Sequence, residues 1–228
     1  MTSSKPQTQD AGAFLEWLTT TRKAMQDHSG SNVACGACTG CCSSSYFIHV
    51  RAHEQASLKK IPKAMLVAAP GWPVGDKLMG YDKHGHCPML KQQQCQIYQD
   101  RPQTCRDYDC RIFTATGLSA GGKEKSQINQ RVADWRFTYP TADDRAAQQA
   151  LLASRTFIQK HADCFPGGRV PQDPTQLALL AIKVYPVFLK QAPGHLNAQD
   201  LSQLALQIIA CAREFDQAIL PLAQTKLN

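Results

Sequence analysis

The chain of 228 residues has no long hydrophobic run. Its longest apolar stretches, residues 64–70 and 177–182, fall far short of the ~20 residues that a membrane-spanning helix needs. The first ten residues are polar and lack the apolar core of a secretory signal peptide. We therefore expect a cytoplasmic protein with no membrane partner.

The sequence also lacks a dense block of lysine and arginine. Its formal charge is +7, from 25 Lys and Arg against 18 Asp and Glu, but the positive residues are spread along the chain. A protein that follows a nucleic-acid backbone concentrates this charge in a patch or stripe. Any cysteine thiolates would offset part of the excess. We therefore expect no nucleic-acid partner.

Catalytic signatures are scarce. The chain contains no phosphate-binding G-x-x-x-x-G-K-[ST], no dinucleotide-binding G-x-G-x-x-G and no H-E-x-x-H zinc motif. The run Gly121-Gly122-Lys123 alone is too short to indicate a phosphate loop. The catalytic residues are unknown, and the absence of a recognised motif favours a protein that is not an enzyme.

Cysteine, by contrast, is abundant and clustered. Of ten cysteines, eight lie within residues 35–110, and the first four are arranged as C-x-x-C-x-x-C-C. A cysteine that only packs needs no partner thiol at a fixed offset, whereas thiolates two residues apart converge when a tight loop wraps a metal. In a reducing compartment clustered cysteines indicate metal ligands more than disulfides. The predicted metal ligands are Cys35, Cys38, Cys41, Cys42, Cys87, Cys95, Cys105 and Cys110.

The spacing leaves the metal open between iron and zinc. A C-x-x-C-x-x-C run is typical of iron–sulfur loops, while zinc takes four tetrahedral ligands from cysteine and histidine. An Fe-S cluster is the first choice, and Zn2+ is the alternative. Adjacent residues usually direct their side chains apart, so Cys41 and Cys42 should not easily bind one ion. The pair indicates two neighbouring sites or one polynuclear centre, and the sequence does not assign cysteines to either.

The second group of cysteines lies in a longer motif. Residues 87–90 read C-P-M-L, residues 95–106 read C-Q-I-Y-Q-D-R-P-Q-T-C-R, and Cys110 follows. With the first group, this pattern resembles the YkgJ-type cysteine-cluster family, whose CxxCxxCC domain is described as zinc- or iron-chelating. The resemblance covers roughly residues 35–113. All eight family cysteine positions are filled, and the Ile97-Tyr98 and Arg101-Pro102 pairs also match. The resemblance implies metal binding but no physiological role.

Other polar residues near the cysteines have two interpretations each. Arg101 and Arg106 could donate hydrogen bonds to thiolates, or could hold loop carbonyls and neighbouring aspartates. Tyr98 is expected to pack over the site. His84 and His86 precede Cys87 and could be ligands, although exposed loop histidines are the simpler interpretation.

The remaining candidate ligands are interpreted as structural. His49 and His53 follow the first cysteine group and are not expected to bind metal. His28, His161 and His195 are interpreted as solvated or helix-end residues. Cys164 and Cys211 lie outside the cluster and are expected to serve packing only.

Apolar periodicity predicts a mainly α protein with two different halves. Helices are expected at residues 11–27, at 52–68 as one or two short pieces, and at 143–161, 177–188 and 201–215, with Pro186 kinking the fourth. Asn197 or Asp200 is the candidate N-cap of the last helix. The chain is expected to divide into an N-terminal helix (1–34), a cysteine-cluster metal-binding domain (35–115) and a helical region (116–228).

The cysteine-rich segment is expected to be irregular, with short strands such as 46–50, and packed with the C-terminal helical part. A region so poor in regular structure cannot bury much apolar surface, so we expect metal to stabilise it.

Three functions agree with this pattern. The first is a metal-binding protein that stores, delivers or senses iron or zinc through eight clustered cysteines. The second is an Fe-S enzyme or electron carrier. The third is a structural-zinc protein whose helical half binds a protein partner, which the sequence leaves unknown.

Overall fold

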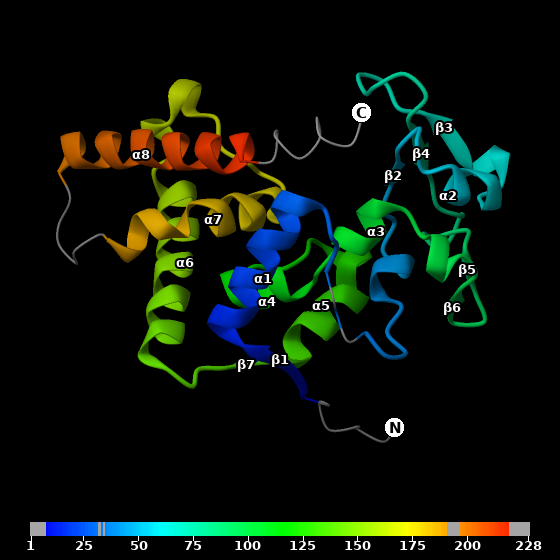
Figure 1. Ribbon diagram of the computed structural model, residues 1–228, viewed down its shortest axis with the longest axis horizontal. Coiled ribbons are helices and arrows are strands. Elements are labelled where there is room, and N and C mark those ends of the chain that lie inside the picture. The colour runs from blue at the N-terminus through cyan, green and yellow to red at the C-terminus, as the bar shows by residue number, and fades with distance from the viewer. Residues whose placement is uncertain (1–7, 32, 34, 191–196, 219–228) are drawn as a thin grey trace. The chain divides into compact units, whose positions relative to one another are not determined.

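The computed structural model describes residues 8–31, 33, 35–190 and 197–218 (Figure 1). The chain is mainly helical with short strands, as expected. The α-helices are α1 (Phe14–Asp27), α2 (Gln55–Lys60), α3 (Gln103–Asp107), α4 (Arg111–Thr116), α5 (Ser126–Asp134), α6 (Ala142–Lys160), α7 (Pro174–Leu189) and α8 (Ala198–Gln217). The strands are β1 (Gln9–Ala13), β2 (Ile48–Val50), β3 (Leu66–Ala68), β4 (Lys77–Met79), β5 (Leu90–Lys91), β6 (Gln94–Cys95) and β7 (Trp135–Thr138).

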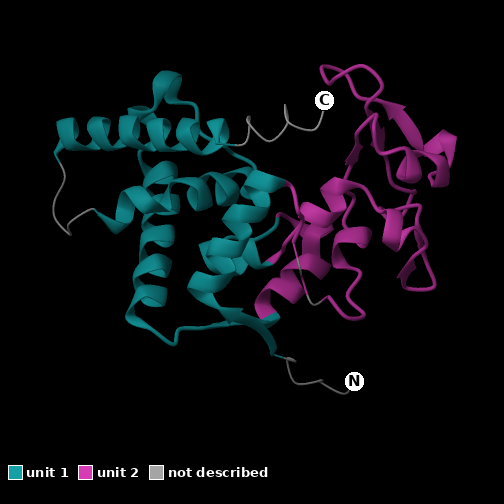
Figure 2. Cartoon of the chain, viewed as in Figure 1, with its two compact units in different colours: residues 1–27, 111–120, 134–228 teal, residues 28–110, 121–133 magenta. Residues whose placement is uncertain are grey.

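The chain folds into two compact units (Figure 2). The first unit contains residues 1–27, 111–120 and 134–228, and the second contains residues 28–110 and 121–133. All eight clustered cysteines belong to the second unit. The three-part division expected from the sequence stays a prediction.

The first unit is a helical bundle built on α6, α7 and α8. Apolar residues at helical spacing on these three helices, together with Phe165 from the segment between α6 and α7, form one buried cluster: Phe157, Ile158, Phe165, Leu177, Val184, Leu204, Ala205 and Ile208. Caps fix where the helices begin. Asn197 accepts hydrogen bonds from the backbone N–H groups of Gln199 and Asp200, and the Asp200 carboxylate accepts one from the Asn197 N–H. Both candidate cap residues therefore take part in one capping box.

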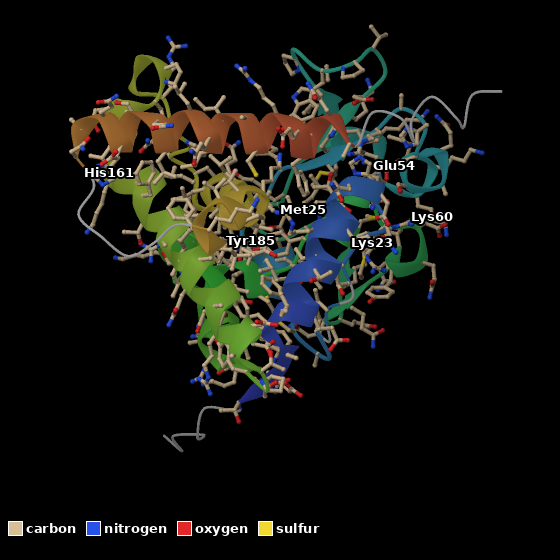
Figure 3. The ribbon with its side chains drawn as sticks, turned by 60° about the vertical axis from the view of Figure 1, so that its left-hand side comes forward. Lys23, Met25, Glu54, Lys60, His161 and Tyr185 are labelled. Carbon is tan, nitrogen blue, oxygen red and sulfur yellow. The ribbon has the colours of Figure 1, made fainter. Side chains whose placement is uncertain are left out.

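Pro186 lies inside α7, three residues before its end. Proline has no N–H, so the carbonyl of Ile182 four residues earlier loses its helical donor. The Arg22 guanidinium from α1 donates to the carbonyls of Ile182 and Lys183. The Arg22 cation also lies 5.2 Å from the ring centroid of Tyr185 on α7. Figure 3 labels Tyr185. Partial burial lowers the pKa of Arg22 from its usual value. A single half-buried cation thus supplies hydrogen bonds to the Ile182 and Lys183 carbonyls.

A parallel pair of strands, β1 and β7, completes the first unit. The sequence analysis placed a helix from residue 11, but residues 9–13 are the strand β1 and α1 begins at Phe14. The partner strand lies more than 120 residues away in the chain, at Trp135–Thr138. Strand pairing with so distant a segment leaves no local signal, which is why helical periodicity extended the helix too far.

The second unit contains short elements and a small core of its own. Strands β2, β4 and β3 form an antiparallel sheet in that order, and β5 pairs with β6. The 52–68 segment is helical at α2 and in a 3-10 turn, Lys63–Met65, but its end is the strand β3, which pairs with β4. Five apolar side chains are buried beneath these elements: Val50, Ile61, Met79, Met89 and Ile97. This core is small, in agreement with the expectation that so irregular a region buries little apolar surface, and stabilisation by metal stays a prediction.

Asp144 joins the start of α6 to the start of α1. Its carboxylate accepts hydrogen bonds from the Thr141 N–H and hydroxyl at 2.9 and 2.6 Å, and from the Leu15 N–H at 2.9 Å. These bonds, led by that of the Thr141 hydroxyl, lower the pKa of Asp144 below its usual value. The charged form is therefore the one that stabilises the fold.

We expect Asp144→Asn to lower the melting temperature at neutral pH, because one amide oxygen cannot replace two carboxylate oxygens. Since the folded-state pKa is depressed, the contribution is complete above the unfolded-state pKa of about 3.9 and is lost as pH falls through the folded-state value. The melting-temperature gap between wild type and variant should therefore narrow in acid. The exposed neighbour Asp143→Asn is the matched control. A gap that is independent of pH would contradict this assignment.

Candidate metal centre

The first two cysteines lie on a tight turn. The Cys38 N–H donates to the Cys35 carbonyl at 2.9 Å, and Gly36 between them has a φ of 54° that suits glycine. The Gly40 N–H in turn donates to the Cys38 sulfur at 3.5 Å. Backbone donors to sulfur stabilise a thiolate, as the residues around metal ligands commonly do. The local sequence thus forms a loop suited to thiolate ligands.

The next two cysteines, Cys41 and Cys42, lie on a 3-10 turn, Gly40–Ser43. Their thiols form a hydrogen bond with each other. The sequence analysis expected adjacent side chains to point apart, as they do in a strand. A 3-10 turn rotates successive side chains by about 120° rather than 180°, so both can reach the same region. Whether the two thiols bind one ion or two stays a prediction.

The later cysteines come from a hairpin and a short helix. The Cys87 N–H donates to the Cys42 carbonyl at 2.7 Å, which ties this segment to the first cysteine group. Cys95 lies on β6, opposite Leu90, and both Cys87 and Cys95 contact the small core. Cys105 lies on α3. Cys35 and Cys41 are exposed and the other six are half-buried.

Thiols from both groups influence one another electrostatically. Cys41 contributes to the pKa shift of each of the other shifted thiols in the cluster. The hydrogen bond from Cys42 lowers the pKa of Cys41 to about 7, while the same bond and burial raise the pKa of Cys42. Loss of solvation, followed by the Cys41 and Cys38 thiols, raises the pKa of Cys35 to about 11. Burial, followed by Cys87 and Cys41, raises the pKa of Cys105 to about 12.

The remaining members adjoin the same region. Burial, with the nearby thiols of Cys95 and Cys41, raises the pKa of Cys87. Tyr108 feels both Cys110 and Cys41, although burial is the main reason that its pKa is raised. The two cysteine groups therefore adjoin each other, through the backbone hydrogen bond between Cys87 and Cys42 and the mutual influence of their thiols.

The chemistry of this donor set fits a soft or borderline metal. Each raised pKa shows that a thiolate is costly there without a cation, and metal binding removes that cost by replacing the thiol proton. Sulfur ligands select zinc, copper(I) and iron–sulfur clusters over magnesium or calcium. The residues present therefore fit zinc or iron.

The sulfur atoms do not close on a single point. In a tetrahedral zinc–thiolate site with bonds of ~2.3 Å, neighbouring sulfurs lie about 3.8 Å apart. Among the described residues, no three of the clustered cysteines have sulfur atoms within 4.8 Å of one another. The described thiols therefore do not form a three-sulfur group at the spacing of one zinc ion.

The two arginines of the motif hold the loop. Arg101 donates to the Tyr98 carbonyl at 2.8 Å, and Arg106 donates to the Arg101 carbonyl at 3.0 Å. Arg101 also lowers the pKa values of Cys41 and Cys105, although other causes are larger at both. Tyr98 was expected to cover the site, but it is 57% exposed and its ring stacks against Arg101 at 4.0 Å. Arg101 therefore combines loop support with electrostatic influence.

Two basic residues that follow Cys110 in the chain also lie near the first cysteine group. The sequence analysis did not predict their part in the site. The Lys125 ammonium lies 3.5 Å from the centroid of the Tyr46 ring and donates to the Ser44 carbonyl. Arg131 on α5 donates to the Cys35 carbonyl at 3.4 Å and lowers the pKa of Cys35, against larger causes that raise it. The helical periodicity of residues 126–134 was the available signal, but nothing local linked it to the cysteines.

The histidines of the second unit lie in loops and on a strand. His49 forms a hydrogen bond with the Asp76 carboxylate at 2.6 Å and stacks against Trp72 at 4.1 Å. The Asp82 carboxylate holds the backbone N–H groups of His84 and His86. Whether any histidine binds metal stays a prediction. His195 lies outside the described residues.

A polar pocket of about 450 Å³ lies in the second unit. The Glu54 carboxylate in its wall accepts hydrogen bonds from the backbone N–H groups of Arg51 and Gln103 at 2.7 and 2.6 Å. Both its oxygens are therefore engaged by the main chain. The cationic side chains of Arg51 and Arg106 also line the pocket, and Arg106 directly follows Cys105. The lining residues are His28, Arg51, His53, Glu54, Gln55, Ala56, Ser57, Gln103 and Arg106.

Residues 117–121 read G-L-S-A-G and match the G-x-S-x-G nucleophile pattern. That motif requires a strand-to-helix turn. Here it follows α4, where the Leu118 N–H donates to the Phe113 carbonyl and Gly117 has a φ of 64°. This is a glycine cap of the Schellman type. The pattern ends a helix and does not present a nucleophile.

Residues 34–132 match the family model CxxCxxCC, described as a putative zinc- or iron-chelating domain. This segment is similar to that domain family, and we refer to it below as the CxxCxxCC domain. The match confirms the resemblance seen in the cysteine motif and supports metal binding. It also extends into α5, which packs against the cysteine turn at Gly40. No curated protein and no solved structure matches the chain. Within the described residues, no helix has the length and apolar character to cross a membrane.

Gly40 lets α5 approach the cysteine turn of the CxxCxxCC domain. A Cβ at Gly40 would lie 3.3 Å from the Ile128 nitrogen and 3.4 Å from the Gln127 carbonyl. Backbone atoms cannot move aside as a flexible side chain can, so we expect Gly40→Ala to lower stability by about 1–3 kcal/mol. Urea unfolding and metal content per chain measure the effect.

Gly80→Ala is the matched control, because its Cβ would meet only the Phe47 ring at an ordinary 3.8 Å. That variant should be neutral or slightly stabilised. Equal unfolding midpoints for the two variants would show that α5 does not depend on the close approach at Gly40.

Proposed function

We propose that the CxxCxxCC domain is a metal-binding module that holds an iron–sulfur centre through its eight clustered cysteines. The observation that carries this proposal is the grouping of thiols from both halves of the motif around Cys41. The eight thiols exceed the four that one tetrahedral ion needs, and their spacing is wider than one zinc ion requires. A polynuclear centre uses the wider spacing, because each iron of a [4Fe–4S] cluster takes its own thiolate, and eight thiols would suffice for two such four-cysteine clusters.

A cluster of this kind suits storage, delivery or sensing of iron, and we propose such a non-enzymatic role first. All ten cysteines are free thiols in the structure. The reducing, cytoplasmic setting expected from the sequence would keep these thiols available as ligands. Zinc is the alternative metal, and in that case the sites would be closed and structural.

Elemental analysis of protein purified without oxygen tests the proposal. We expect iron with acid-labile sulfide, a brown colour, and bleaching of the visible absorption by dithionite, because iron–sulfur clusters are coloured and redox-active. A colourless, folded protein with about two zinc ions per chain would refute the iron–sulfur centre.

Two serine variants test the ligands in the same assay. Cys38→Ser should lower metal content and thermal stability together, because a hydroxyl is a poor ligand for soft metals. Cys211→Ser is the matched control, since Cys211 lies in the helical bundle, where its thiol is 3.7 Å from the Lys183 carbonyl. Unchanged metal content in the Cys38 variant would remove Cys38 from the ligands.

The polar pocket favours a second candidate, an Fe-S enzyme acting on a small anion. Arg51 and Arg106 supply the positive charge, and the main chain already holds the one carboxylate in the wall. Guanidinium groups bind carboxylate and phosphate by paired hydrogen bonds. The position of Arg106 next to Cys105 would place such an anion beside a ligand segment of the centre.

Thermal shift with inorganic phosphate and with acetate tests the pocket. We expect stabilisation that rises with anion concentration in the wild type and falls in Arg51→Gln, because one of the two cations is lost. The exposed Lys91→Gln removes the same charge from the β5–β6 hairpin and serves as control. Equal shifts in both variants would show a general charge effect and exclude the pocket.

A further inference from the structure

The turn that follows α6 gathers three side chains able to bind metal. His161 is the C-cap of α6, and a 3-10 turn, Ala162–Cys164, follows it. The Cys164 N–H donates to the His161 carbonyl at 3.0 Å, which closes the turn. Side chains three residues apart in a 3-10 turn lie on the same side, so His161 and Cys164 face one region. Figure 3 labels His161 at this end of α6.

The ligand atoms of His161, Asp163 and Cys164 all lie within 4.8 Å of one another. In the described part of the chain, this is the one set of three histidine, cysteine or carboxylate side chains that meets that distance. Around a tetrahedral zinc ion the corresponding separations are about 3.3–3.6 Å, given bonds of ~2.0–2.3 Å. Side-chain rotations that close roughly 1 Å would therefore complete the geometry.

Packing holds two of the three ligands in place. The His161 ring lies 4.9 Å from the ring of Phe157, a buried residue of the helical core. Cys164 is half-buried against the same core. Asp163 is exposed, and its carboxylate lies 4.0 Å from the Cys164 sulfur. Two positioned ligands and one adjustable ligand lower the entropic cost of closing on an ion.

We propose that His161, Asp163 and Cys164 form a second metal site, which binds Zn2+ with a nitrogen, an oxygen and a sulfur ligand. Zinc accepts all three donor types, whereas magnesium and calcium select oxygen ligands alone. Water would take the fourth position, and the Cys164 thiol would release its proton on binding. The site differs from the cysteine centre in both its ligands and its place in the chain. It also revises the interpretation of His161 and Cys164 as residues without a ligand role.

Alkylation followed by peptide mass spectrometry tests the site, because the method follows each cysteine separately. The purified protein, with its cysteine centre as isolated, is treated with iodoacetamide in the presence and absence of micromolar ZnCl2. We expect zinc to slow modification of Cys164 at least tenfold, because a bound thiolate is not free to react, and we expect EDTA to restore the rate. Cys211, on α8 of the same unit, is the internal control and should react equally in both conditions. Equal modification of Cys164 with and without zinc would overturn the proposal.

Variants of the other two ligands test the composition of the site. His161→Gln and Asp163→Asn should each weaken the zinc protection of Cys164, while His53→Gln, which changes an exposed histidine of the second unit, should leave it intact. Because Asp163 is exposed, its variant keeps the test valid even where loss of the His161 ring disturbs the core. Full protection in either ligand variant would overturn the three-ligand site.

Discussion

The crowding of thiols around Cys41 is the constraint on which the CxxCxxCC domain depends. Cysteines from separate turns, a hairpin and a short helix influence one another electrostatically, and most of those whose pKa is shifted resist ionisation. Such a group is unfavourable as a set of thiolates without a cation. A bound metal removes the repulsion and links the segments, so the local electrostatics and the chain connectivity both favour a metal centre.

Backbone and side-chain groups prepare this centre before any metal binds. The Gly40 N–H supports the Cys38 sulfur, and the Cys87 N–H reaches the Cys42 carbonyl across 45 residues of sequence. Arg101 supports its loop while contributing positive charge to nearby thiols. The small apolar core against which Cys87 and Cys95 pack also stabilises this unit, independently of any metal. A centre supported in this way resembles a preorganised ligand set more than a chain that folds around its ion.

In the helical unit, two charged side chains satisfy backbone groups that would otherwise lack hydrogen-bond partners. Pro186 interrupts the hydrogen bonding of α7, and one partly buried arginine from α1 supplies the missing donors. Asp144 connects the first turn of α6 to that of α1. Each contact joins elements far apart in the sequence and satisfies polar groups that burial would otherwise penalise. The His161 turn at the other end of α6 projects from the same bundle.

The sequence by itself determined the helical class, the long helices α6, α7 and α8, and the eight cysteines as one motif, because periodicity and ligand spacing are local properties. It did not reveal β1, β3 or the role of α5, since each acts through a partner distant in the chain. The convergence of Cys41 and Cys42, and the meeting of His161 with Cys164, were decided by 3-10 turns. Turn geometry sets where side chains point, and spacing in the sequence alone does not specify it.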